Sequence, residues 1–182
     1  MKKTGKILIY CGGNFEFQYK DFSPKLMAND YRAKILANVD KILYQPFNKN
    51  LFRKIGPNVY YVGPYYFYNN GLDGSNIVNT EFEMVEKCTH AIFLVDNINI
   101  PGTVSEIIHA SLSHKNITIF FIKQSVDEKE PEKEICNSNW YPLQIARQIG
   151  NATLVECDDR EMAKMLIYNY VDNLVAKNIV KC

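Results

Sequence analysis

Short runs of apolar residues alternate with longer stretches in which apolar residues recur every three or four positions. The short runs predict buried strands, because they are brief, rich in β-branched side chains and bounded by turn residues. Five strands are expected, at residues 6–11, 58–63, 90–96, 116–123 and 152–157. The longer stretches predict amphipathic helices at residues 30–45, 77–88, 104–114, 139–149 and 159–177.

This alternation predicts an α/β fold with a Rossmann-like, doubly wound sheet of about five mostly parallel strands flanked by helices. The run NITIFFIK at 116–123 is continuously apolar, which is typical of a strand buried on both faces. Ligands of such sheets bind beyond the carboxyl ends of the strands. The loops that follow Cys11, Val62 and Asp96 are therefore expected to line one pocket.

Composition narrows the class of protein. The 182 residues are 47% hydrophobic and carry a formal net charge of +1, which predicts a single domain over residues 1–182. Because acidic and basic residues are balanced, the chain lacks the basic surface that binding to a nucleic-acid polymer requires. A small molecule is therefore the expected partner. No apolar run has the length of a membrane span or of a signal-peptide core, so we expect a cytoplasmic protein without a membrane partner.

The cysteines and histidines lack the spacing of a metal site or of a disulfide framework. The cysteines are dispersed and form no CxxC pair, which favours buried apolar roles for Cys11, Cys88, Cys136, Cys157 and Cys182. No thiol or carboxylate stands at ligand spacing from the histidines, which are His90, His109 and His114. We therefore expect neither a metal nor a cofactor.

Glu106 has two competing interpretations. Thr103 and Glu106 have the T-x-x-E spacing of a capping box, in which both side chains only start a helix. Alternatively, Glu106 follows the strand that ends at Asp96, at the edge of the sheet where ligands bind. A helix N-terminus favours the ionised form of a carboxyl group, which suits a nucleophile at neutral pH.

Other polar and glycine positions fall at the same edge of the predicted sheet. Glu81 has apolar neighbours at helical spacing, so it either lies buried near the pocket or reaches water from the first turn of its helix. The turn at Gly12 and Gly13 allows a sharp exit from the first strand and the close approach of a ligand. His109 shares a helical face with Glu106, and a surface or interface role is the simpler interpretation.

An aromatic cluster follows the second predicted strand. Its members are Tyr60, Tyr61, Tyr65, Tyr66, Phe67 and Tyr68. Aromatic rings of this kind stack on planar ligands such as nucleobases, but they more often form a core edge or a subunit interface. Both interpretations remain open.

Three segments together resemble the nucleoside 2-deoxyribosyltransferase family, including its relatives that hydrolyse nucleoside monophosphates. They are ILIYCGG, EFEMVEKCTHAIFLVD and PGTVSEIIHA, and the resemblance extends over roughly residues 6–122. The family's Tyr and Gly at the end of the first strand match Tyr10 and Gly12. The acidic residue on the family's middle helix matches Glu81, and the Asp that ends the next strand matches Asp96. The Gly and Glu of its G-x-x-x-E helix start match Gly102 and Glu106.

The resemblance implies cleavage or transfer at an N-glycosidic bond of a nucleoside or nucleotide. Glu106 would attack the anomeric carbon, Tyr10 would hold its carboxylate, and Glu81 would help to protonate the leaving base. The expected substrate-binding positions are Gly12, Gly13, Asn14, Asp96 and Gly102. The resemblance also implies a homo-oligomer whose pocket is completed across a subunit contact.

Two alternatives share this scaffold. One is a non-catalytic nucleotide-binding or sensing module, in which Glu106 serves only as a cap and ribose contact. The other is a phosphoribohydrolase with a glycine-rich PGGxGTxxE loop, of which IPGTVSE is a partial match. The family usually has Asp in place of Glu81 and a polar residue in place of Ile100, so the base and the sugar remain open.

Overall fold

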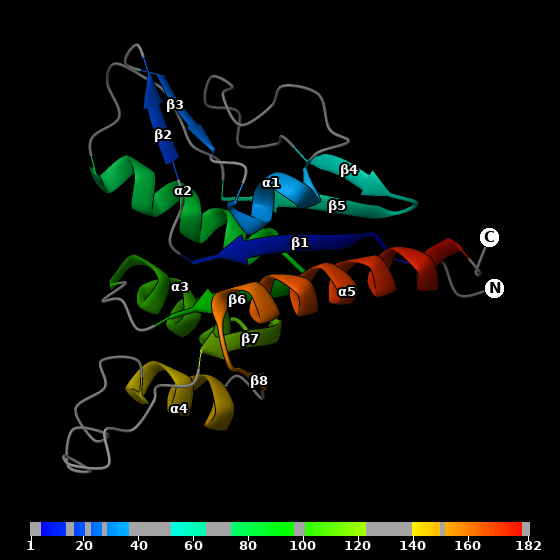
Figure 1. The fold of residues 1–182 in the computed structure, drawn as a ribbon. Helices are drawn as coiled ribbons and strands as arrows, with labels where there is room; N and C mark the ends of the chain where they lie inside the picture. The colour runs from blue at the N-terminus through cyan, green and yellow to red at the C-terminus, as the bar shows by residue number, and fades with distance from the viewer. Residues whose placement is uncertain are drawn as a thin grey trace.

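The computed structural model describes most of the chain. The described residues are 5–13, 17–20, 23–26, 29–36, 52–64, 74–96, 101–122, 140–149 and 152–179. In them a six-stranded sheet is flanked by helices on both faces (Figure 1), which confirms the predicted α/β, Rossmann-like architecture.

The sheet has the strand order β4-β5-β1-β6-β7-β8. Five neighbouring strands are parallel, and β4 pairs with β5 in the antiparallel direction at one edge. The strands are β1 (Ile7–Gly12), β4 (Arg53–Gly56), β5 (Val59–Gly63), β6 (His90–Val95), β7 (Asn116–Ile122) and β8 (Thr153–Cys157). The five parallel strands correspond to the five that the apolar runs predict.

The order of the parallel strands determines where a ligand is expected to bind. Across the sheet the parallel strands stand in the order β5-β1-β6-β7-β8, and β1 precedes β5 along the chain. The winding of the chain therefore reverses direction between β1 and β6. In open α/β sheets the connections on the two sides of such a reversal diverge, and this leaves a crevice outside the carboxyl ends of the two strands. Gly12 ends β1 and Asp96 follows β6, so this crevice adjoins two of the predicted loops.

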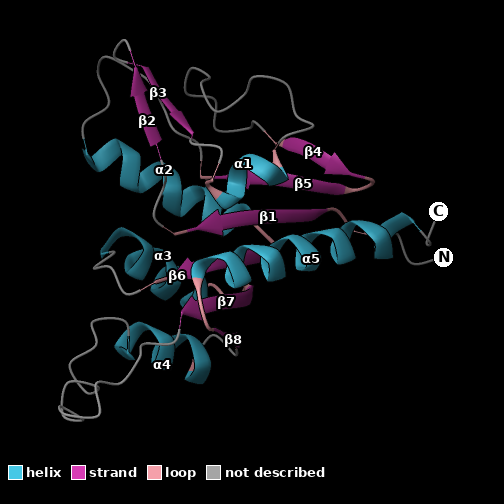
Figure 2. Cartoon of the chain, in the orientation of Figure 1, coloured by secondary structure: helices cyan, strands magenta, loops and turns pink. Residues whose placement is uncertain are grey.

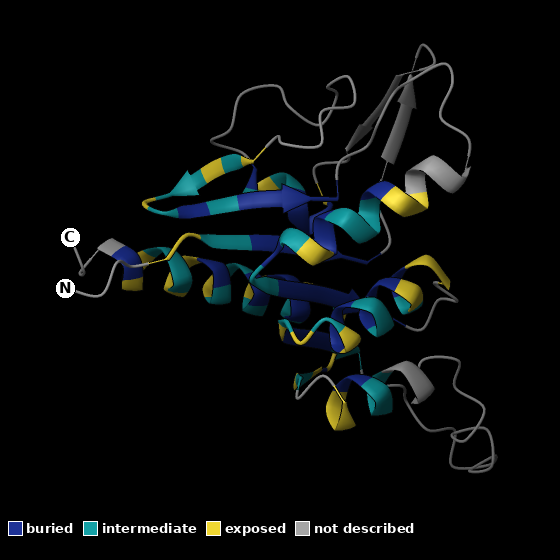
Figure 3. Cartoon of the chain, turned by 180° about the vertical axis from the view of Figure 1, so that it is seen from behind, coloured by how far each residue is buried: buried dark blue, intermediate teal, exposed yellow. Residues whose placement is uncertain are grey.

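The helices form two layers. On one face α1 (Tyr31–Ile35) packs on α5 (Arg160–Ile179). On the other face α3 (Pro101–Leu112) contacts both α2 (Gly74–Lys87) and α4 (Trp140–Gln148). The central strands between the layers are mostly dark blue in Figure 3, because Ala91–Val95 of β6 and 117–120 of β7 are buried. Continuous burial explains why these strands read as unbroken apolar runs.

Two parts of the fold were missed by the sequence pattern. A separate antiparallel hairpin, β2 (Phe17–Lys20) and β3 (Ser23–Leu26), follows β1 (Figure 2). The edge strand β4 turns into β5 through Pro57 and Asn58, and Asn58 has a φ of 57°. Both segments are short, polar and interrupted by proline or glycine, so they lack the apolar signal of a core strand.

Helix starts were also misplaced. α2 begins at Gly74 and α3 at Pro101, each three residues before the predicted start. The N-cap predicted at Asp30 is confirmed, since its carboxylate accepts a hydrogen bond from the backbone N–H of Arg32. The rest of the helix predicted to reach residue 45 lies outside the described residues, beyond Leu36.

The described residues contain neither a membrane-spanning helix nor a metal-binding cluster. None of the helices in these ranges has the length and apolar character needed to span a membrane. Within the same ranges, no three His, Cys, Asp or Glu side chains are grouped so that they could hold a metal ion.

Candidate active site

Glu106 reaches from α3 to the end of β1. Its side chain is buried, with 6% exposure. A Cβ atom placed on Gly12 would lie 2.8 Å from the Glu106 Oε2 atom and 2.3 Å from the ring of Phe93. The carboxyl group therefore rests directly on the Gly12 backbone, beside the point where the winding of the sheet reverses.

The capping-box interpretation of Glu106 is wrong. α3 begins at Pro101, so Thr103 lies within the helix and cannot be its N-cap. The Ser105 hydroxyl already donates to the carbonyl of Pro101, four residues earlier. Glu106 lies in the second turn of α3. It is therefore beyond the free backbone N–H groups of the first turn, from which a capping side chain accepts hydrogen bonds.

Tyr10 contributes a second buried polar group to the same place. It is fully buried on β1, and its ring centroid lies 6.2 Å from that of Phe93. Burial, followed by the charges of Glu106 and Glu81, raises the pKa of Tyr10 well above its ordinary value. Neither the Tyr10 hydroxyl nor Glu106 Oε2 has a hydrogen-bond partner of normal geometry among the described residues.

Buried polar atoms without partners are uncommon and cost free energy. Here two of them belong to side chains that influence one another's ionisation and lie at the crevice expected from the strand order. Such a pair marks a functional-site candidate, because a bound ligand or water can satisfy both atoms.

Glu81 is the third member of the cluster. It is half-buried on α2. Burial raises its pKa, and the positive charge of Arg32 opposes that rise. Its negative charge in turn raises the pKa of Glu106. The structure thus brings Glu81, Glu106 and Tyr10 together, from three separate elements.

The ionisation state expected for Glu106 from the sequence is wrong. Burial and then the charge of Glu81 raise its pKa to about 8, while Tyr10 and Arg32 act in the opposite direction. The helix-terminus effect fades within the first turn, and Glu106 lies beyond it. At neutral pH the carboxyl group therefore holds a proton in most molecules.

The two glycines after β1 serve different needs. Gly12 is required by the close approach of Glu106 and Phe93. Gly13 has a φ of +126°, and a Cβ there would lie 2.6 Å from the carbonyl oxygen of Leu94. Gly12 thus leaves room for the carboxyl group, and Gly13 allows the chain to pass close to Leu94 as it leaves β1.

The remaining predicted binding residues differ in position. Asp96 is buried after β6, and its carboxylate accepts a hydrogen bond from Arg160 at the start of α5. Gly102 is exposed in the first turn of α3, and no described residue comes within 4 Å of a Cβ built there. Asn14 lies outside the described residues, as do Ile100 and the aromatic residues 65–68.

Several other sequence candidates have structural roles. Tyr61 is buried and its hydroxyl donates to the carbonyl of Pro64, while Lys6 lies over the ring of Tyr60. His109 stacks on Phe82, with ring centroids 4.5 Å apart, which supports its interface role between α3 and α2. The cysteines in the described ranges, Cys11, Cys88 and Cys157, are buried and free, as expected. Cys136 and Cys182 lie outside those ranges.

The sequence pattern missed Arg32. This arginine is fully buried and forms an ion pair with Asp30, with 2.9 Å between Nη2 and Oδ2. Its charge lowers the pKa of both Glu81 and Glu106. An arginine in the first turn of an amphipathic helix normally points to water, so nothing in the sequence distinguished it from a solvated charge.

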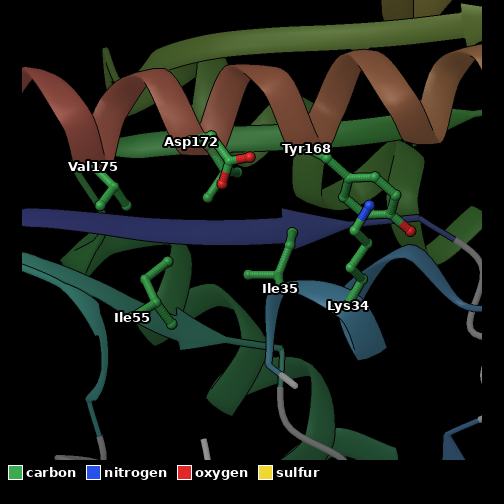
Figure 4. A pocket seen from close by; sticks show the side chains of 7 residues that line it. Lys34, Ile35, Ile55, Tyr168, Asp172 and Val175 are labelled. Atoms are coloured by element: carbon green, nitrogen blue, oxygen red, sulfur yellow. The ribbon is translucent and has the colours of Figure 1, made fainter. Parts of the chain in front are cut away.

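A cavity of about 350 Å³ lies elsewhere, between α1, β4 and α5 (Figure 4). Its walls are mainly apolar, from Ile35, Ile55, Val171 and Val175, and the Lys34 ammonium lies over the Tyr168 ring. Glu106, Tyr10 and Glu81 are absent from its lining. We place the candidate site at Glu106 and not in this cavity, because the perturbed carboxyl groups are clustered there.

Comparisons with known proteins give little beyond this geometry. No protein-family model matches the chain, and no curated protein matches it. Among solved structures, a match is found to the CMP N-glycosidase BcmB of Clostridium botulinum, with a TM-score of 0.42 and 15% sequence identity. It covers 57% of this chain and 75% of that chain. Similarity at this level assigns neither a family nor a substrate.

Replacing Gly12 tests the close approach of Glu106. We expect Gly12→Ala to lower the free energy of unfolding by about 1–3 kcal/mol, because the added methyl group overlaps the Phe93 ring and Glu106 Oε2. Urea denaturation measures this change. Gly102→Ala is the matched control, since the space there is open, and it should be neutral or up to about 1 kcal/mol stabilising. Equal stabilities for the two variants would contradict the geometry.

Replacing Glu106 tests its protonation. The pKa of Glu106 is 4.5 ordinarily and about 8 in the folded protein. Between pH 4.5 and 8 the carboxyl group is therefore protonated in the folded state and ionised in the unfolded state. Stability therefore falls as pH rises through this window and levels off above it. Glu106→Gln should match the parent protein near pH 4 and exceed its stability by roughly 5 kcal/mol well above pH 8. Denaturant midpoints across pH measure this, with the exposed Glu86→Gln as control; parallel curves for Glu106→Gln and the parent would show an ordinary carboxyl.

Proposed function

We propose that this protein cleaves or transfers the N-glycosidic bond of a nucleoside or nucleotide, with Glu106 as the nucleophile. The observation that carries the proposal is the buried carboxyl group of Glu106 on the Gly12 backbone, beside Tyr10, with an Oε2 atom that has no hydrogen-bond partner of normal geometry among the described residues. The resemblance of three sequence segments to nucleoside 2-deoxyribosyltransferases supports the same reaction.

In the first step the Glu106 carboxylate attacks the anomeric carbon of the sugar. A glycosyl ester bond forms, the bond from that carbon to the base nitrogen breaks, and the nitrogen receives a proton from Glu81. In the second step water or an acceptor base attacks the same carbon, the ester bond breaks, and Glu81 takes up the proton that the attacking group loses. Two displacements retain the configuration of the sugar carbon.

Tyr10, the sugar and Glu81 each supply something that this division of roles needs. The Tyr10 hydroxyl lies near enough to Glu106 to lower its pKa, and it can donate to the carboxylate once Glu106 is ionised. Positive charge that develops on the sugar in the transition state stabilises the same anion. Glu81 is only half-buried, so it can exchange its proton with water between the two steps.

The rate should depend on the small ionised fraction of Glu106. With a pKa of about 8, roughly a tenth of the molecules carry the carboxylate at pH 7. A buried carboxylate without its hydration shell is a stronger nucleophile than one in water. Burial thus makes the carboxylate of Glu106 rarer at neutral pH but more reactive.

A product assay tests the proposed reaction. The protein is incubated with a panel of nucleosides and their 5'-monophosphates, with and without a second base, and free base or exchanged nucleoside is measured by chromatography. We expect turnover that falls more than about a thousandfold in Glu106→Gln, because the nucleophile is lost. Ser105→Ala, an exposed neighbour on α3, should retain activity.

Each other result points to a defined alternative. Tight nucleotide binding without turnover supports the sensing module, and exchange without net hydrolysis identifies a transferase. Mass spectrometry of a trapped fluorosugar ester locates the nucleophile. An ester on Glu81 would reverse the roles of the two carboxyl groups, and an intact wild-type rate in Glu106→Gln would refute the proposal.

The pH profile tests the coupling between Glu81 and Glu106. With an activated nucleoside whose base leaves without protonation, we expect kcat/KM to rise with pH to a plateau above the pKa of about 8, because the ionised form of Glu106 then reacts without help from an acid. Glu81→Gln removes the charge that raises this pKa, so its profile should shift to lower pH. The activated nucleoside also keeps the variant measurable, and Glu83→Gln on the same helix is the control. A profile that does not move in Glu81→Gln contradicts the coupling.

A further inference from the structure

The exit of β1 is held by two adjacent side chains of α1. The Tyr31 hydroxyl donates to the carbonyl of Gly12 at 2.6 Å. The Arg32 Nη1 atom donates to the carbonyl of Cys11 at 3.2 Å and to that of Gly13 at 2.9 Å. Three consecutive carbonyl groups are therefore fixed from the opposite helical layer to that of Glu106.

Arg32 is itself fixed by Asp30. Its Nε and Nη2 atoms donate to the two carboxylate oxygens of Asp30, at 3.0 and 2.9 Å. Both side chains are buried, with exposures of 0% and 1%. The bidentate ion pair fixes the orientation of the Arg32 guanidinium group. A lysine could not make the same two parallel contacts, because its charge is concentrated on one ammonium nitrogen.

This arrangement bears on the reaction because Gly12 is the surface on which the Glu106 carboxyl group rests. Only 2.8 Å would separate Glu106 Oε2 from a Cβ at Gly12, so a small shift of this backbone moves the carboxyl group or blocks it. We propose that Arg32, with Tyr31 beside it, is a positioning residue that holds the Gly12 backbone in register with the Glu106 carboxyl group. The inference rests on the proposed function of Glu106.

Charge adds to the geometric argument. The groups that face Glu106 are Tyr10 from β1, Glu81 from α2, and Arg32 with Tyr31 from α1. Burial and Glu81 raise the pKa of Glu106, whereas Tyr10 and Arg32 lower it. Among these groups Arg32 alone carries a positive charge. Its removal should therefore leave the proton more firmly on Glu106.

A purely structural role for the Asp30–Arg32 pair is the competing explanation. An N-cap with a buried ion pair stabilises the fold, and its loss lowers stability. It would not change the turnover of the molecules that remain folded, nor the titration of a carboxyl group on another helix. Rate and titration are therefore the measurements that separate the two roles.

The experiment compares four variants of the full chain. Arg32→Lys keeps the positive charge but loses the bidentate geometry of the guanidinium group. Tyr31→Phe removes the hydrogen bond to Gly12 without a change in charge. The double variant Asp30→Asn with Arg32→Gln removes both charges of the ion pair. Lys34→Gln is the matched control, because it removes an exposed positive charge from the same helix. The titration of Glu106 is followed by carboxyl ¹³C NMR, assigned by its absence in Glu106→Gln, and turnover is measured at saturating substrate.

We expect Arg32→Lys to lower kcat on the order of 10- to 100-fold with KM nearly unchanged, because the carboxyl group is misplaced. Tyr31→Phe should lower kcat in the same direction by a smaller factor. The Glu106 titration should remain near that of the parent protein in both, and move to higher pH in the double variant. Lys34→Gln should change neither quantity.

Wild-type kcat in folded Arg32→Lys and Tyr31→Phe would overturn the positioning role. If the double variant fails to fold, these two single variants decide, and Tyr31→Phe decides alone if Arg32→Lys also fails. If the parent protein shows no turnover, the proposed function fails separately. The Gly12 and Gly13 amide shifts and the Glu106 titration then still test the inference, and it fails if they are unchanged in every folded variant.

Discussion

The structure of this site depends on one contact, the burial of the Glu106 carboxyl group against the backbone of Gly12. The contact exists because β1 and β6 are neighbours at the reversal of the winding, so the end of β1 and the helix after β6 meet at one edge. A side chain at Gly12 would close the gap. The strand order thus creates the place, and the glycine keeps it open.

Burial explains the electrostatics of the cluster. Two carboxyl groups and a phenol lie close together in a region of low dielectric, where their charges repel strongly. The pKa values of Glu106, Glu81 and Tyr10 are all raised, and burial is the largest cause for each. Burial therefore keeps Glu106, with its pKa of about 8, mostly protonated at neutral pH, and it favours the neutral forms of Glu81 and Tyr10 as well.

The sequence predicted the parts of this arrangement that depend on local pattern. Five apolar runs predicted the parallel strands. Tyr10 and Gly12 near the end of the first strand, and Glu106 in the helix after the third, were therefore expected at one edge of the sheet. Prediction from the sequence failed where tertiary burial decides. Thr103 and Glu106 have capping spacing, yet the helix starts at Pro101. The ionisation of Glu106 depends on Glu81 and Arg32, which belong to other helices. The sequence gives no sign that Arg32 is buried, because a charged residue on an amphipathic helix is normally exposed.

Stability alone does not account for the cluster. The Tyr10 hydroxyl and Glu106 Oε2 are buried without partners among the described residues, and apolar side chains of similar volume would pack there without unsatisfied polar atoms. Tyr10 belongs to the same buried core cluster as Ile9, Ile92 and Ile107, so the core that it shares is apolar. Two ionisable groups in such surroundings, with a fixed arginine that lowers the pKa of Glu106, support the proposal of chemistry at that carboxyl group.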